Sequence, residues 1–202
     1  MNRQIIQFTT EEAWLKEREK DLTSSDIPVL FGCGYMTIEE LKGEKKSGIR
    51  TPFESNERMD WGIALQDGIA HEFARQNQWT IRKKTEYIRI PKLRIGSSFD
   101  FGITLDNKEP LIEYLESALL EIKNVDTFEY RSKWLTSGFD IEATPYIELQ
   151  VQHQMLVSGL KVAYIGALIG GNKGILLRRE ADKKVQDEIL RRSEKFWKEV
   201  GK

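Results

Sequence analysis

Two charged residues interrupt an apolar run near the middle of the chain, and this constrains the fold more than any other feature. Residues 119–123 read Leu-Leu-Glu-Ile-Lys, a pattern that predicts a β-strand. Side chains alternate between the two faces of a strand, so Glu121 and Lys123 share one face while Ile122 lies on the other. Burying a charged side chain in a core-like strand costs free energy, so such a residue is expected to have an ion-pair partner or a function. An ion pair between Glu121 and Lys123 on an edge strand is the plainer explanation, and the triplet alone does not exclude it.

A second carboxylate, Asp100, lies near the end of another predicted strand. A single hairpin-like connection would bring Asp100 beside Glu121. Two carboxylates form an oxygen-rich pocket that suits Mg2+, the backbone carbonyl of Ile122 can add another oxygen, and Mn2+ is expected to substitute. Lys123 would then orient, or help to deprotonate, the water that attacks phosphorus. These residues predict metal-assisted hydrolysis of DNA.

The same triplet occurs twice more in a different setting. Glu40-Leu41-Lys42 and Glu44-Lys45-Lys46 lie in a polar, lysine-rich segment. Both are typical of a solvated helix or loop, whereas Glu121 and Lys123 stand among apolar residues. The surroundings, and not the spacing alone, single out the third triplet.

Composition narrows the class of protein. With 202 residues, 40% of them hydrophobic, the chain is expected to form a single domain over residues 1–202. A net charge of -1 argues against a generally basic surface, so DNA contacts must be local. The one cysteine, Cys33, excludes an internal disulfide and a four-cysteine zinc or iron–sulfur site within one chain. Neither a signal pattern nor an apolar stretch of membrane length is present, so we expect a cytoplasmic protein without membrane contact.

Hydrophobic spacing predicts helices that alternate with strands. Apolar residues recur every four positions over 56–76, and a similar pattern covers 146–160. The glycine- and lysine-containing segment 43–57 is expected to be an exposed loop, and 170–173 a hairpin turn. The remaining expected elements are helices at 11–20 and about 180–200, and strands at 86–90, 94–105, 111–114, 117–123, 162–169 and 174–178. This order predicts a mixed α/β core with the carboxylates on its central sheet.

Four motifs, in the same order, resemble those of the lambda exonuclease, or YqaJ-like viral recombinase, branch of the PD-(D/E)XK nucleases. Together they span most of the chain. The resemblance implies a restriction-endonuclease-like fold, with a central mixed sheet flanked by helices. The matching segments are Trp14 to Arg18 followed by Ser25, Trp61-Gly62 to Leu65-Gln66, Ser98-Phe99-Asp100 with Glu121-Ile122-Lys123, and Tyr146 to Gln150.

The resemblance also implies roles for individual residues. Asp100, Glu121, Lys123 and Gln150 would be catalytic, and Gln150 would position water or the scissile phosphate through its amide. Asp100, Glu121 and the carbonyl of Ile122 would hold the metal. A guanidinium and hydroxyl groups suit a terminal phosphate. The residues implied to hold the 5′-phosphate are Arg18, Ser25 and Ser98.

The chain departs from the family pattern at three positions. Gln66 stands where the family has a glutamate that supports the metal site, and Asp67 stands at the usual proline. Asp67 would face about 100° away from Gln66 on a helix, so it is left out of the expected ligands. Phe99 replaces the proline before the catalytic aspartate. Gln152 and His153 are expected to be packing or surface residues.

The function implied by the resemblance is a Mg2+-dependent 5′-to-3′ exonuclease. Such an enzyme degrades one strand of linear double-stranded DNA and leaves a 3′ overhang. The family further implies a homotrimer ring around DNA, a phage single-strand annealing protein as partner, and a phage or prophage gene in a bacterial host. Two alternatives stay open. One is a PD-(D/E)XK endonuclease, and the other is a non-catalytic DNA-end-binding protein that keeps the fold.

Overall fold

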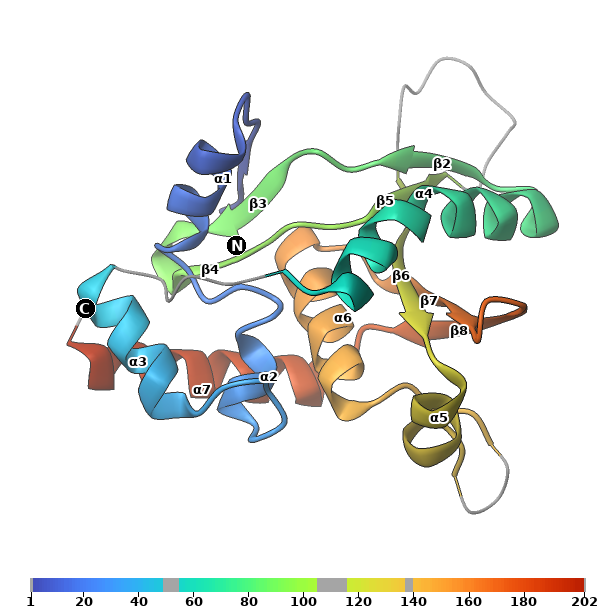
Figure 1. Cartoon of the computed structure of the whole chain (residues 1–202). Coiled ribbons are helices and arrows are strands. Elements are labelled where there is room, and N and C mark those ends of the chain that lie inside the picture. The colour runs from blue at the N-terminus through green and yellow to red at the C-terminus, as the bar shows by residue number, and fades with distance from the viewer. Residues whose placement is uncertain (1, 49–54, 105–115, 137–139, 202) are drawn as a thin grey trace.

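A five-stranded mixed sheet forms the centre of the protein (Figure 1). The computed structural model describes residues 2–48, 55–104, 116–136 and 140–201. The central sheet has the order β2-β5-β6-β7-β8, in which β6 and β7 run parallel and the other neighbours run antiparallel. Its strands are β2 (Thr80–Lys83), β5 (Phe101–Thr104), β6 (Ala118–Val125), β7 (Val162–Ile169) and β8 (Lys173–Glu180). A smaller antiparallel sheet has the order β1-β3-β4, with β1 (Gln4–Ile6), β3 (Tyr87–Ile90) and β4 (Ile95–Ser97).

Helices cover both faces of the central sheet. The helix α4 (Glu57–Asn77) packs through Ile69 and Phe73 on the face that Leu120 and Ile122 of β6 present. On the opposite face, α6 (Pro145–Ser158) packs against the sheet, and α2, α3 and α7 gather beside it (Figure 1). The other helical elements are α1 (Glu11–Arg18), α2 (Ile27–Leu30), α3 (Ile38–Ser47), α5 (Thr127–Glu129) continuing into a wider turn at Tyr130–Trp134, α7 (Lys183–Val200) and a short 3₁₀ turn at Pro91–Leu93. Within the described part of the chain, no helix combines the length and apolar character needed to cross a membrane.

Most predicted helices form, with small shifts at their ends. Thr10 caps α1 by accepting a hydrogen bond from the backbone of Ala13, and Asn56 caps α4 in the same way. The terminal helix begins at Lys183 and not near 180, because the hairpin strand β8 continues to Glu180. Of the apolar stripe on α4, Ile69 and Phe73 are buried, but Trp61 is 57% exposed and Leu65 36%.

The loop predicted for 43–57 is wrong in its first part, because residues 38–47 form α3. Thr37 accepts a hydrogen bond from the backbone of Glu40, whose carboxylate accepts one from the backbone of Thr37. Gly48 ends the helix with φ +71°, a conformation that glycine adopts without strain. The single buried residue of this helix, Leu41, is fully enclosed, so one apolar anchor was too weak a signal to predict α3. Residues 49–54 of the predicted loop lie outside the described residues.

The strand predicted for 94–105 is divided between two sheets. Its first part is β4 in the smaller sheet, and its second part is β5 in the central sheet. The chain passes from one sheet to the other at Ser98, Phe99 and Asp100. Alternation of side chains continues through such a crossing, so periodicity alone could not reveal it. The strand predicted at 111–114 lies outside the described residues, and the predicted hairpin between β7 and β8 is confirmed.

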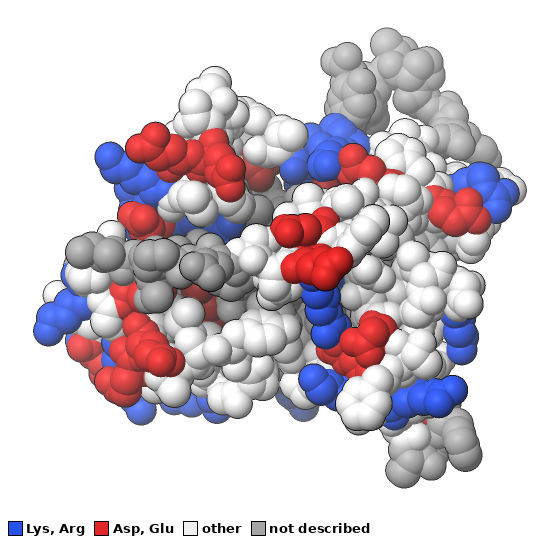
Figure 2. All heavy atoms as spheres, viewed as in Figure 1, with Lys and Arg blue, Asp and Glu red and all other residues white. Residues whose placement is uncertain are grey.

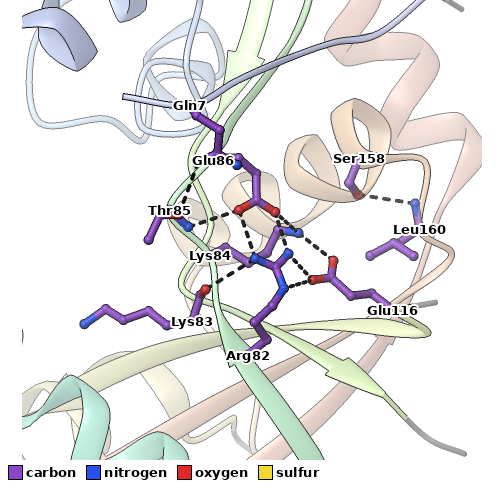
Figure 3. Close-up of polar contacts among 9 residues, drawn as sticks. All are labelled: Gln7, Arg82, Lys83, Lys84, Thr85, Glu86, Glu116, Ser158 and Leu160. Atoms are coloured by element: carbon purple, nitrogen blue, oxygen red, sulfur yellow. Dashed lines mark hydrogen bonds and ion pairs between the residues drawn. The ribbon is translucent and has the colours of Figure 1, made fainter. Parts of the chain in front are cut away.

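A partly buried network of four charges joins the strands next to this crossing (Figure 3). Lys84, whose side chain is 4% exposed, contacts Glu86 at 2.6 Å and Glu116 at 2.5 Å. Arg82 contacts the same two carboxylates at 2.7 and 2.5 Å. The backbone N–H of Lys84 also donates to the carbonyl of Asp100 at 2.9 Å. The network therefore holds the end of β2 against the residue that begins β5.

We predict that this network makes stability sensitive to acid. Burial alone would raise the pKa of Glu86, but hydrogen bonds from Arg82 and Lys84 outweigh it and lower the pKa to about 2. Because the folded pKa lies below the ordinary value of 4.5, the contribution is present above pH 4.5 and is lost as the pH falls toward 2. Urea unfolding between neutral and acid pH should show a steeper loss of stability for the wild type than for Glu86→Gln. Parallel curves would contradict this assignment.

Candidate active site

The two carboxylates predicted to act together meet where β5 begins beside β6. Phe101 pairs with Leu120 in the antiparallel register, so the next pair places Asp100 opposite Glu121. The Asp100 carboxylate accepts a hydrogen bond of 2.8 Å from the backbone N–H of Ile122. Continuing the strand register thus brings together two residues that are 21 positions apart in the sequence.

Three side chains hold the Glu121 carboxylate, which is almost fully buried. Lys123 contacts one oxygen at 2.5 Å, and the Gln150 amide donates to the same oxygen at 2.6 Å. The Gln154 amide donates to the other oxygen at 2.7 Å. Gln150 and Gln154 are one helical turn apart on α6, so they reach β6 from one face of the helix. The carbonyl oxygen of Gln150 also accepts from Lys123 at 3.1 Å.

The charge of Glu121 acts on the ionisation of Asp100 and Lys123. Burial, and then the negative charge of Glu121, raise the pKa of Asp100 to about 7, against the opposing effects of Lys123 and the Ile122 N–H. Burial by itself would lower the pKa of Lys123, but Glu121 and Asp100 outweigh it and raise the pKa. Lys123 is therefore an ammonium that donates hydrogen bonds in this state. That protonation state suits a residue that orients water or phosphate more than one that removes a proton.

The donor set fits a hard divalent cation. The carboxylates of Asp100 and Glu121 adjoin and the pKa of Asp100 is raised, so a positive ion at this site would relieve the repulsion. Amide oxygens nearby add neutral donors of the type that Mg2+ accepts. Over the ranges that the structure describes, no cluster of three or more His, Cys, Asp or Glu residues could hold a metal. The site thus offers two charged ligands, and the remaining ligands would be neutral.

Gln66 explains why a third carboxylate is missing here. Its side chain hydrogen-bonds Asp100 from α4, so it occupies the position from which a glutamate would face the site. Asp67 points elsewhere and pairs with Lys83 at 2.7 Å on the exposed surface. The helix geometry used to leave Asp67 out of the ligands agrees with this placement.

We predict that Gln66→Glu will strengthen metal binding, because it adds a negative charge beside Asp100. The apparent Kd for Mg2+ or Mn2+ should fall about tenfold. Calorimetric titration of the protein with Mn2+ measures this directly, without relying on activity. Gln76→Glu makes the same change on an exposed turn of α4 and should leave the Kd unchanged. An equal fall in Kd for both variants would show that the net charge of the protein, and not the position of the added carboxylate, determines its affinity for the metal.

Of the three residues implied to hold a 5′-phosphate, Arg18 and Ser98 are linked through Trp14. The guanidinium of Arg18 lies 4.2 Å from the centre of the Trp14 ring, and the Trp14 indole N–H donates to the Ser98 hydroxyl at 2.9 Å. Ser25 lies in the turn before α2, where its hydroxyl is 3.0 Å from that of Thr23. Arg18 and Thr23 line one small cavity. Arg18 and Ser98 are thus joined by contact, and Ser25 lies in the turn that borders the same cavity.

Two residues at these sites were not predicted. Lys45 of α3 lines the cavity with Arg18, donates to the Asp21 carbonyl at 2.7 Å and pairs with Asp26 at 3.0 Å. Its segment had been interpreted as solvated. Gln154 is the other, and its amide reaches both Glu121 and, at 3.5 Å, the Ser98 carbonyl. The spacing of four residues was the signal that could have identified it.

Gln152 and His153 are packing residues in the structure. The Gln152 amide donates to the Glu180 carbonyl at 2.8 Å and accepts from the Asp182 backbone at 2.9 Å, which joins α6 to the start of α7. His153 is fully buried, and burial lowers its pKa to about 3. A neutral imidazole enclosed in the core has no part in the carboxylate cluster.

Comparisons with known proteins agree with this architecture. Residues 13–161 match the family described as the YqaJ-like viral recombinase domain. No curated protein matches the chain in sequence. The chain is similar to the alkaline exonuclease LHK-Exo from Laribacter hongkongensis, with a TM-score of 0.71 and 19% identity over 94% of this chain and 92% of that chain. For LHK-Exo in complex with dAMP the TM-score is 0.73 and the identity 20%, with the same coverage.

A more distant likeness is to a phage-related exonuclease from Haemophilus somnus 129PT. Its TM-score is 0.55 and its identity 12%, over 81% of this chain and 80% of that chain. At these identities the likeness concerns the fold. The predicted fold class, a restriction-endonuclease-like central mixed sheet flanked by helices, is confirmed.

Proposed function

The chain belongs to the family of the YqaJ-like viral recombinase domain, and from this premise we propose that it is a Mg2+-dependent 5′-to-3′ exonuclease acting on linear double-stranded DNA. It would degrade one strand and leave a 3′ overhang for single-strand annealing recombination. A nuclease role in the broad sense is supported by the family and by the exonucleases that share the fold. The polarity, the metal and the DNA substrate are parts of the proposal.

One observation carries the proposal. Asp100, Glu121, Lys123 and Gln150 converge where β5 begins beside the middle of β6, and Gln154 links this cluster to the backbone of Ser98. Ser98 in turn contacts Trp14, on which Arg18 stacks. A cluster suited to phosphodiester hydrolysis is therefore contiguous with a guanidinium and a hydroxyl suited to a terminal phosphate. An exonuclease needs both in this proximity, whereas an endonuclease needs only the first.

Each residue of the site has a separate role in the proposed reaction. Asp100, Glu121 and the Ile122 carbonyl would hold Mg2+, which supplies positive charge to the scissile phosphate when bound. Lys123 donates hydrogen bonds to the attacking water or to the phosphate, and Gln150 fixes the ammonium of Lys123 through its carbonyl oxygen. Arg18, Ser25 and Ser98 would bind the 5′-phosphate and so select the strand end. Gln154 keeps Glu121 oriented.

The charge of the surface bears on how DNA would be retained. Lysine and arginine side chains alternate with acidic ones over the face shown in Figure 2, without a continuous basic track, and the net charge is -1. Retention by phosphate contacts alone would then be weak. A homotrimer ring around DNA, as the family implies, would retain the substrate by enclosure. We propose this assembly together with a phage single-strand annealing protein as partner and action in the bacterial cytoplasm.

Digestion of labelled DNA tests the proposal. Linear duplex carrying a 5′ label on each strand in turn is incubated with Mg2+ and either wild type or Glu121→Ala, and closed circular DNA serves as the control substrate. We expect release of 5′ label from linear DNA only, and none with Glu121→Ala. Cutting of the circle would favour the endonuclease alternative. Retention of every label by the wild type, with DNA ends still bound, would favour the non-catalytic alternative.

A further inference from the structure

Tyr35 is an aromatic side chain held out in solvent beside the catalytic cluster. It lies in the connection between α2 and α3 and is 89% exposed. One edge of its ring nevertheless rests on Tyr146, with ring centroids 4.8 Å apart and an angle of 58° between the planes. Contact with a second ring limits the positions that Tyr35 can take while most of its surface stays open.

Tyr146 connects Tyr35 to the catalytic residues. It belongs to the first turn of α6, one turn before Gln150. Burial raises the pKa of Tyr146 to about 12, and the charges of Lys123 and Glu121 act on its phenol. The phenol of Tyr146 in turn contributes to raising the pKa of Lys123. Tyr146 and Gln150 share one face of α6, and Gln150 contacts both Lys123 and Glu121. Tyr35 therefore rests on a ring that lies one helical turn from a residue of the catalytic cluster.

A cation also lies near Tyr35. Arg58, in the first turn of α4, is within electrostatic range of the Tyr35 phenol. Its guanidinium pairs with Glu129 and, at 3.3 Å, with Asp126 at the start of α5, and it remains 59% exposed. An exposed ring and an exposed guanidinium thus lie near each other, and the ring borders the catalytic cluster through Tyr146. These are the two kinds of group with which proteins bind a single strand, since bases stack on rings and phosphates pair with cations.

We propose that Tyr35 stacks on a nucleobase of the DNA strand engaged at the catalytic cluster. This rests on the proposed function and adds a residue that recognises bases without reading their sequence. A ring accepts any base, as an enzyme that degrades a whole strand requires. A protein partner seated on Tyr35 would instead cover the catalytic residues next to it. The position of Tyr35 therefore favours the substrate as its partner.

The test compares substitutions that keep or remove the ring. Tyr35→Leu should raise KM for linear duplex about tenfold, because stacking on one base is lost. Tyr35→Phe keeps the ring and should match the wild type. The control, Phe128→Leu, makes the same type of change at an aromatic residue that is 81% exposed on α5, and it should leave KM unchanged. An unchanged KM in Tyr35→Leu overturns the proposal.

A substrate change separates stacking from a general effect on binding. Duplexes are prepared with an abasic nucleotide at successive positions from the 5′ end. At the position that Tyr35 contacts, wild type and Tyr35→Leu should show the same KM, because neither has a base to stack on. If Tyr35→Leu shows the same loss at every abasic position as on intact DNA, the ring does not stack on a base and the proposal is wrong.

A binding signal keeps this inference distinct from the proposed activity. In the Lys123→Ala background, duplex carrying 2-aminopurine near its 5′ end should show a fluorescence change on binding that Tyr35→Leu removes. If wild type cuts no DNA but this signal depends on Tyr35, the proposed function fails and the stacking stands. If wild type cuts DNA and the signal is the same with Tyr35→Leu, the stacking fails and the proposed function stands.

Discussion

Lys123→Ala should lower the rate of cleavage roughly 1,000-fold while DNA binding changes little. The side chain contacts Glu121 at 2.5 Å and Gln150 at 3.1 Å, so it lies inside the cluster and contributes little outer surface. Its removal takes away the ammonium of this cluster, which can stabilise charge developing on the phosphate. The rate is measured as release of 5′-labelled nucleotide with saturating DNA, and binding by fluorescence anisotropy with the same duplex.

A matched control exists in the second Glu-x-Lys triplet. Lys42 stands two residues after Glu40, as Lys123 stands after Glu121. Lys42 instead pairs with Glu39 at 2.8 Å and with Glu199 of α7 at 2.7 Å, and so it joins two helices. Lys42→Ala should keep the rate of cleavage. A similar loss in both variants, or full activity in Lys123→Ala, would remove Lys123 from the catalytic residues.

Arg18→Ala should lower the preference for a 5′-phosphorylated end by about 10- to 100-fold. The guanidinium lies over the Trp14 ring, and the Trp14 indole N–H donates to the Ser98 hydroxyl. A charge-assisted hydrogen bond to a phosphate is lost with the guanidinium, but the carboxylate cluster stays intact. The measurement is the ratio of kcat/KM for duplexes with 5′-phosphate and with 5′-hydroxyl ends.

The control for Arg18 is another arginine stacked on an aromatic ring. Arg192 lies 4.2 Å from the centre of the Phe31 ring and donates to the Leu30 carbonyl at 2.6 Å. Arg192→Ala removes the same kind of packing and should leave the ratio unchanged. If the wild type itself degrades both kinds of end at equal rates, Arg18 has no role in phosphate recognition.

The proximity of Asp100, Glu121, Lys123 and Gln150 could be predicted because it depends on local patterns. Alternation along a strand placed Glu121 and Lys123 on one face, and the register of β5 with β6 brings Asp100 opposite Glu121. The helix spacing that placed Gln150 and Gln154 on one face of α6 also agrees with their shared contact to Glu121. Short-range periodicity is sufficient where a regular element presents its side chains to one neighbour.

Other features depend on contacts that no local pattern encodes. Lys45 lines the cavity beside Arg18 only because α3 folds back over the turn that contains Asp26. The exposure of Trp61 follows from how far α4 is covered by the sheet, although its spacing is identical to that of buried Phe73. The crossing at Ser98 to Asp100 is determined by which sheet each half of the segment joins. Each of these requires the tertiary arrangement.

The crossing between the two sheets has a consequence for the size of the product. Ser98 and Asp100 are separated by one residue, and two steps of extended chain span at most ~7 Å. If Ser98 holds the terminal phosphate and Asp100 belongs to the cutting site, the backbone between them sets the distance from the terminal phosphate to the bond that is cut. This distance is comparable to the length of one nucleotide. An enzyme with this fixed distance would release mononucleotides, because a longer fragment would not fit between Ser98 and Asp100. Inserting a glycine between Ser98 and Asp100 would then alter the length of the fragments, and not only the rate at which they appear.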